Sequence, residues 1–174
     1  MLGYVVAEGR GAGDVLIARA SERLRAAGLR LAGAVQVNVE RPDRPRCDME
    51  LHILRGTDVV KISQNLGRGS RGCRLDPDGL ERAVGTVEAA LDGPVDLVIV
   101  NKFGKQEAEG RGFRPVFARA LADGIPLVTA VSRSNRDGFI AFSGGIAEEL
   151  PAEPERLAAW CLAAVRRPGL LAAR

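Results

Sequence analysis

The segment from Val95 to Val100 constrains the fold of this chain more than any other. It is rich in β-branched residues and follows the breaker pair Gly93-Pro94, a pattern typical of a central strand in a parallel sheet. Parallel strands need long crossover connections, which are usually helices. The segment therefore predicts a sheet covered by helices, and the rest of the chain has patterns for both kinds of element.

Further apolar runs alternate with helical patterns along the chain. Leu2–Ala7, Leu31–Val37 and Ile125–Val131 are predicted strands. Other stretches carry apolar residues with the spacing of one helix face: Leu16, Ala20 and Leu24; Leu80, Val84, Val87 and Leu91; Val116, Phe117, Ala120 and Leu121; Leu157, Trp160, Cys161, Ala164 and Val165. The alternation predicts one three-layer α/β/α domain over residues 1–174, with a mainly parallel sheet.

One pair of predicted strands departs from this alternation. Met49–Leu54 and Val59–Ile62 flank the turn Arg55–Asp58, with no room for a helix between them. We therefore expect an antiparallel hairpin inserted at about residues 48–63.

Composition narrows the class of protein. Hydrophobic residues make up 46% of the chain, but no apolar run approaches the ~20 residues of a membrane-spanning helix, so we expect no membrane partner. Three widely spaced cysteines without a C-x-x-C pair favour a reducing cytoplasm, and the single histidine, His52, argues against a metal site. The net charge of +3 is spread along the chain, which does not favour a nucleic-acid partner. Assembly into a homo-oligomer is compatible with this composition.

A first glycine-rich loop, Glu8–Asp14, follows the first predicted strand. In a phosphate-binding loop, glycines let backbone N–H groups surround an anion, a lysine reaches the phosphates and Ser or Thr binds magnesium. Here Asp14 and Val15 occupy the positions of the lysine and the hydroxyl residue. The loop is thus either a degenerate phosphate loop or a tight turn in which Asp14 complements the helix dipole. Its candidate ligand-binding residues are Gly9, Gly11, Gly13 and Asp14.

A second loop, Ser63–Arg74, combines three arginines with glycines and with hydroxyl and amide groups. Guanidinium groups bind oxyanions through paired hydrogen bonds, and glycines allow close approach of the backbone. The loop is either an anion cradle or a solvated loop. Its candidate binding residues are Ser63, Asn65, Arg68, Ser70 and Arg71.

A third loop, Asn101–Gly112, follows the strongest predicted strand and concentrates charge. It is either a functional loop or a set of surface ion pairs. Its candidate binding residues are Asn101, Lys102, Lys105, Glu107 and Arg111, and Glu107 and Glu109 are its candidate bases. The three loops form one site only if they meet at the carboxyl edge of the sheet. We expect that they can meet only if the first and third strands are neighbours.

Three segments carry a resemblance to a known family. Gly72–Pro77, the long run Val98–Gly112 and Gly124-Ile125-Pro126 resemble a bacterial family known as domain of unknown function 2478, over nearly the whole chain. The resemblance implies an oxyanion related to molybdenum uptake, molybdate or tungstate, as a ligand.

The layout is more distantly similar to the thermophilic and cancer-related nucleoside triphosphatases, which are P-loop proteins. Gly104, Lys105 and Glu107 match their Asp-Glu-x-Gly-Lys-x-Glu segment, but Asn101 and Lys102 replace the acidic pair that would hold magnesium. This resemblance implies a P-loop-like fold with degraded hydrolytic motifs.

These observations favour binding over catalysis. The leading hypothesis is a protein that binds a nucleotide or an oxyanion such as phosphate, molybdate or tungstate. The alternatives are a nucleoside triphosphatase or phosphotransferase, and a regulatory interaction domain without a ligand.

Overall fold

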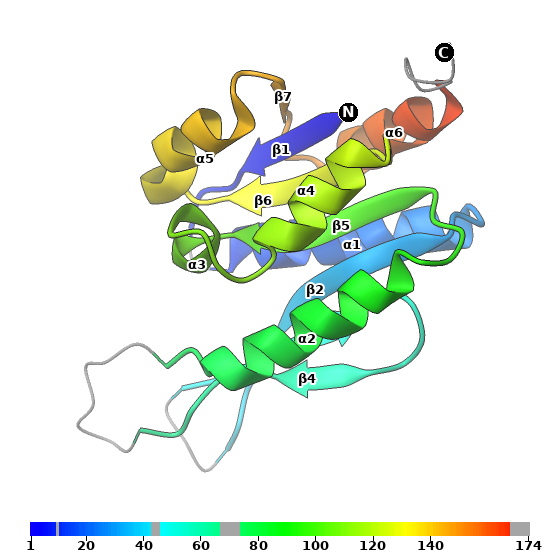
Figure 1. The fold of residues 1–174 in the computed structure, drawn as a ribbon. Helices are drawn as coiled ribbons and strands as arrows, with labels where there is room; N and C mark the ends of the chain where they lie inside the picture. The colour runs from blue at the N-terminus through cyan, green and yellow to red at the C-terminus, as the bar shows by residue number, and fades with distance from the viewer. Residues whose placement is uncertain (10, 43–45, 67–73, 168–174) are drawn as a thin grey trace.

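The computed structural model describes residues 1–9, 11–42, 46–66 and 74–167. Its elements, in chain order, are β1 Leu2–Val6, α1 Ala12–Ala26, β2 Leu31–Val39, β3 Asp48–Ile53, β4 Val59–Lys61, α2 Pro77–Ala90, β5 Leu97–Phe103, α3 Lys105–Ala108, α4 Arg114–Ala122, β6 Leu127–Val131, the 3-10 turn η1 Arg133–Asn135, α5 Arg136–Ser143, β7 Ala147–Leu150 and α6 Pro154–Arg166. Figure 1 shows the sheet with α2 and α4 in front of it.

The sheet has seven strands in the order β4-β3-β2-β5-β6-β1-β7. The five strands β2, β5, β6, β1 and β7 are parallel to one another. By contrast, β3 runs antiparallel to β2, and β4 runs antiparallel to β3. The mainly parallel α/β fold predicted from the sequence is therefore confirmed. All the parallel strands end at the same edge, where ligands bind in open α/β sheets.

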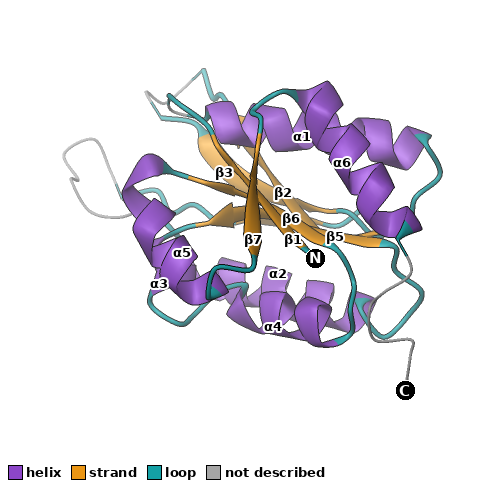
Figure 2. Ribbon diagram, turned by 90° about the horizontal axis from the view of Figure 1, so that it is seen from above, coloured by secondary structure: helices purple, strands orange, loops and turns teal. Residues whose placement is uncertain are grey.

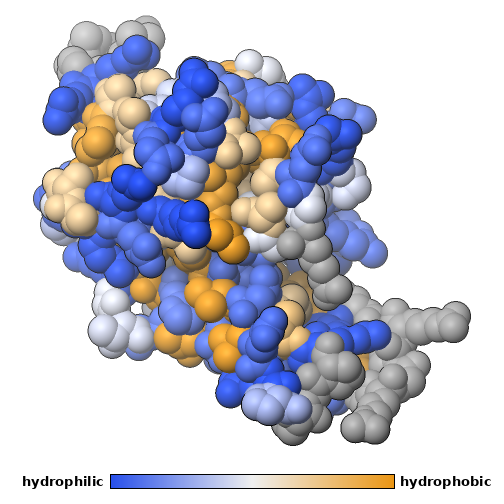
Figure 3. Space-filling model, turned by 180° about the vertical axis from the view of Figure 1, so that it is seen from behind, coloured by the Kyte–Doolittle hydropathy of each residue, from blue (hydrophilic) through white to orange (hydrophobic). Residues whose placement is uncertain are grey.

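Helices cover both faces of the sheet and bury two separate apolar cores (Figure 2). On one face, α1 and α6 pack over β-strand residues such as Val5, Leu97 and Ile99. On the other, α2, α4 and α5 pack over residues such as Val98 and Val100. The alternation of Val98, Ile99 and Val100 between the two cores explains why β5 is apolar throughout. In Figure 3, hydrophilic side chains surround smaller apolar areas on the face opposite α2 and α4.

The strands β3 and β4 extend the sheet as an antiparallel pair at its edge. Asp48, buried at the start of β3, holds the base of this pair together. It accepts a hydrogen bond from Ser63 Oγ at 3.5 Å and pairs with Lys61 Nζ at 3.1 Å and Arg41 Nε at 3.0 Å. We call β3 and β4 with their connecting turn the edge hairpin.

Elements missing from the sequence prediction are mostly short or polar. The strand β7 carries two adjacent glutamates, and its polar side chains have specific partners: Tyr4 Oη donates to Glu149 at 2.7 Å and Trp160 Nε1 to Glu148 at 2.9 Å.

No helix among the described residues is long and apolar enough to cross a membrane.

Candidate functional site

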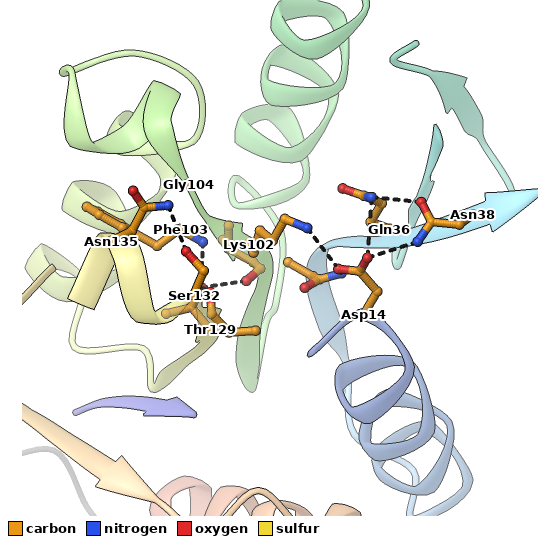
Figure 4. A network of polar contacts seen from close by, with 12 residues as sticks. Asp14, Gln36, Asn38, Lys102, Phe103, Gly104, Thr129, Ser132 and Asn135 are labelled. Atoms are coloured by element: carbon orange, nitrogen blue, oxygen red, sulfur yellow. Dashed lines mark hydrogen bonds and ion pairs between the residues drawn. The ribbon is translucent and has the colours of Figure 1, made fainter. Parts of the chain in front are cut away.

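Asp14 lies at the centre of a buried polar network at the carboxyl edge of the sheet (Figure 4). It belongs to the first turn of α1, whose N-cap, Gly11, has a φ of 77°. Its side chain is almost fully buried, yet it is surrounded by donors from two strands. On β5, Asn101 Nδ2 donates to Oδ1 at 3.1 Å and Lys102 Nζ lies 3.3 Å from the same oxygen.

The other carboxylate oxygen of Asp14 is held by β2. Asn38 Nδ2 donates to Oδ2 at 3.0 Å and Gln36 Nε2 at 3.4 Å, and the Gln36 amide also donates to Asn38 Oδ1 at 3.0 Å. Both oxygens of the carboxylate are thus engaged inside the protein. A buried charge is tolerated when it is paired and hydrogen-bonded in this way.

The first and third loops meet although their strands are not neighbours. β6 lies between β1 and β5, so the expectation that the two strands must be adjacent is wrong. The helix α1 packs against β5, β2 and β6, and this carries Asp14 across to the end of β5. The contact between Asp14 and Lys102 therefore comes from the path of the helix.

The glycines of the first loop serve the turn itself. The N–H groups of Ala12, Asp14 and Val15 donate to the carbonyl oxygens of Gly9 and Gly11. A Cβ on Gly13 would lie 3.2 Å from the Cβ of Ala130, so this glycine lets α1 approach β6 closely. These amides are used within the loop, which leaves fewer donors for an anion than in a phosphate-binding loop.

The second loop is described only at its two ends. Ser63 Oγ accepts a hydrogen bond from the N–H of Met49 at 2.9 Å and so supports the edge hairpin, while Asn65 is exposed. Arg68, Ser70 and Arg71 lie outside the described residues. After them, Arg74 is fixed by hydrogen bonds from Nη2 to the carbonyl of Cys47 at 3.0 Å and from Nε to the carbonyl of Gln64 at 3.3 Å.

Glu107, a candidate base, organises the backbone of the third loop. Its buried carboxylate accepts hydrogen bonds from the N–H of Gly104 at 2.9 Å and from the N–H of Phe113 at 3.0 Å. Burial raises the pKa of this carboxyl above its usual value, although the two backbone hydrogen bonds act in the opposite direction. Because both oxygens bind backbone, the arrangement suits a structural role in closing the loop between α3 and α4.

The remaining charges of the third loop lie at the surface. Glu109 pairs with Arg111 and, at 3.6 Å, with Lys105, whose side chain is 80% exposed. These ion pairs match the surface alternative considered from the sequence. Lys105 is nevertheless free to swing toward a ligand, because an exposed pair of this kind contributes little to stability.

A cavity of about 530 Å³ opens beside this network. It lies between the edge hairpin, the start of α2 and the end of β5. Its apolar lining comes from Met49, Leu51, Ile62, Leu75, Leu80 and Phe113; its polar and charged lining comes from Gln36, Arg46, Arg74, Asn101, Lys102, Gly104, Lys105, Gln106 and Glu107. Among the site residues proposed from the sequence, the cavity is lined by Asn101, Lys102, Lys105 and Glu107. The sequence analysis did not propose Gln36, Arg46, Arg74 or the apolar lining. The position of Gln36 and Asn38, two polar residues at the end of an apolar strand, could have indicated that this strand end belongs to the site.

The chain is similar to three kinds of known protein. The model of the family described as Protein of unknown function (DUF2478) matches residues 2–160. The Molybdenum import ATP-binding protein ModC 2 of Bradyrhizobium diazoefficiens is 40% identical over 147 residues, which make up 84% of this chain and 16% of that protein. This chain therefore corresponds to a small part of that relative.

A solved structure shares the fold. The crystal structure of THEP1 from the hyperthermophile Aquifex aeolicus superimposes with a TM-score of 0.61 at 15% identity, covering 96% of this chain and 100% of that one. At this identity the likeness concerns the fold alone, and it confirms the predicted P-loop NTPase-like architecture.

Proposed function

The chain belongs to the family described as protein of unknown function DUF2478, and from the geometry of its site we propose that it binds a nucleotide without hydrolysing it efficiently. The observation that carries the proposal is the contact between Asp14 and Lys102, 3.3 Å apart at the carboxyl edge of a P-loop-like sheet. In this contact a carboxylate and an ammonium group stand in the opposite places from those that phosphoryl transfer needs.

Phosphoryl transfer on this fold requires cations around the phosphates and carboxylates around magnesium. In this chain a carboxylate, Asp14, occupies the lysine position of the phosphate loop, and a lysine, Lys102, replaces an acid at the end of β5. The carboxylate would repel a phosphate placed over the first loop. A ligand anion is instead attracted toward the cations beside the cavity, which include Lys102 and Lys105.

Two comparisons support a nucleotide as the ligand. The fold is that of P-loop proteins, and the relative from Bradyrhizobium is named an ATP-binding protein. The cavity of about 530 Å³ lies within the range of roughly 300–1,000 Å³ typical of small-molecule sites.

A second candidate ligand is a bare oxyanion, molybdate or tungstate. It is favoured by the same relative, which is named a molybdenum import protein. Lys102 and Lys105 would then neutralise the oxyanion without magnesium, as an ammonium group does for phosphate.

Isothermal titration calorimetry separates these possibilities. ATP, ADP, GTP, phosphate, molybdate and tungstate are titrated into the wild type and Lys105→Ala, with and without magnesium; Arg156→Ala, an exposed residue of α6 paired with Glu153, is the matched control. We expect nucleotide binding without magnesium that is weakened at least threefold by Lys105→Ala and unchanged by Arg156→Ala.

Other outcomes identify the alternatives. Binding of molybdate or tungstate but of no nucleotide would establish the oxyanion. Magnesium-dependent release of phosphate from ATP would contradict the proposal and support a nucleoside triphosphatase. Absence of any binding would favour a regulatory interaction domain.

A further inference from the structure

We propose that the cavity between the edge hairpin, α2 and α3 holds the base of the nucleotide against its apolar lining, with the phosphates on its charged side among Arg46, Arg74, Lys102 and Lys105. The inference rests on the proposed function, and it places the ligand to one side of the phosphate loop. It also gives the edge hairpin a purpose, because residues of β3 and the end of the hairpin form one wall.

The apolar side of the cavity suits a flat heterocycle. Its six apolar side chains come from four separate parts of the chain: Met49 and Leu51 of β3, Ile62 after β4, Leu75 just before α2 with Leu80 in its first turn, and Phe113 before α4. A compact oxyanion pressed against such a surface would lose hydration without gaining hydrogen bonds, which is unfavourable. A nucleobase gains from the same surface because its faces are apolar.

The volume leads to the same conclusion. The cavity of about 530 Å³ lies within the range of roughly 300–1,000 Å³ typical of sites for small organic molecules. A single tetrahedral oxyanion would leave most of this space filled with water. A base and its sugar fill it to the extent expected of a small-molecule site.

The cations are placed for the other end of such a ligand. Arg74 is held in position by its hydrogen bonds to the carbonyls of Cys47 and Gln64. Lys102 reaches from the cavity toward Asp14, and its side chain is 41% exposed. Lys105 is the most exposed of the paired lysines, so it can reach a phosphate on the charged side of the cavity.

Asn101 lines the cavity and carries a hydrogen-bond acceptor that is unsatisfied within the described part of the chain. Its Nδ2 donates to Asp14, while its buried Oδ1 has no hydrogen-bond partner among the described residues. An unsatisfied buried acceptor costs free energy, and a donor that reached it would remove that cost. The amino groups of adenine and guanine are such donors, whereas molybdate carries none at neutral pH.

The test compares ligands with and without a base. The dissociation constants of ATP and of inorganic tripolyphosphate are measured by calorimetry for the wild type and for Met49→Trp, which fills the cavity from a partly buried position. Val59→Trp is the matched control, because Val59 is half exposed on β4 and does not line the cavity. Thermal unfolding without ligand checks that each variant is folded.

We expect ATP to bind the wild type at least tenfold more tightly than tripolyphosphate. Met49→Trp should remove this difference while tripolyphosphate still binds, and Val59→Trp should preserve it. Equal affinities for the two ligands in the wild type would overturn the inference and leave the proposed function standing, as would an unchanged tenfold preference in folded Met49→Trp. If neither ligand binds the wild type, the proposed function and this inference both fail.

Discussion

The carboxylate of Asp14 lies 3.3 Å from the ammonium group of Lys102. The two residues come from α1 and β5, and they are in direct contact at the carboxyl edge of the sheet. Lys102 supplies the charge that Asp14 needs, because a lone buried carboxylate would be costly. The first and third loops are therefore joined by one ion pair.

The first prediction concerns this pair. Asp14→Asn and Lys102→Met are combined in a double-mutant cycle, and the free energy of unfolding is measured by urea denaturation. Since the two groups interact directly, we expect a coupling of at least ~0.5 kcal/mol, within the range for contacting residues. Strictly additive effects would show that the contact contributes nothing.

The second prediction concerns Gly112. Its φ is 57°, and a Cβ there would lie 2.3 Å from Glu107 Oε1, so Gly112→Ala should displace the carboxylate that closes the loop. Gly110 is the matched control, since its φ is 89° and nothing lies within 4 Å of a Cβ. We expect Gly110→Ala to cost about 1–2 kcal/mol from the backbone alone and Gly112→Ala to cost clearly more. Equal losses in chemical denaturation would argue against a structural role for Glu107.

The third prediction is the titration of Glu107. Burial raises its pKa, so its carboxyl should titrate above 4.5 in a ¹³C NMR pH series. A raised pKa means that folding favours the protonated carboxyl. Its stabilising contribution is therefore fully present below pH 4.5, the unfolded pKa, and is lost as the pH rises through the raised pKa of the folded state. Relative to wild type, Glu107→Gln should lack this pH-dependent loss. A carboxyl that titrates below 4.5 would contradict the assignment.

The fourth prediction concerns Cys161. Burial raises the pKa of this thiol to about 12, so almost no reactive thiolate exists at pH 8. In the variant Cys47→Ala/Cys73→Ala, we expect a thiol reagent to label Cys161 only when the protein unfolds, with a rate that rises steeply in denaturant. Rapid labelling in buffer would mean that the core around α6 is open.

The sequence predicted the layers of this fold well because its signals are strong and local. The buried run in β5 and the helical spacing in α1, α2, α4 and α6 are present in the structure. The strand β7 was missed because Glu148 and Glu149 give it a polar pattern, and Tyr4, the partner of Glu149, is far away in the chain.

The site was predicted only in part. The charged residues of the third loop could be found from their density along the chain. The contact of Asp14 with Lys102 could not, because it depends on α1 crossing the sheet past β6. The cavity could not be predicted either, since residues as distant as Met49 and Phe113 become its walls only after the strands have paired.

Nucleotide binding at the cavity is tested most directly by titrating the ¹⁵N-labelled protein with ATP and following the amide signals by NMR, with and without magnesium. We predict that the largest amide shifts occur around the cavity, at residues such as Leu75 and Gln106, that they do not require magnesium, and that ATP stays intact. Shifts confined to the first loop around Gly11 and Gly13, dependent on magnesium and followed by release of phosphate, would contradict it.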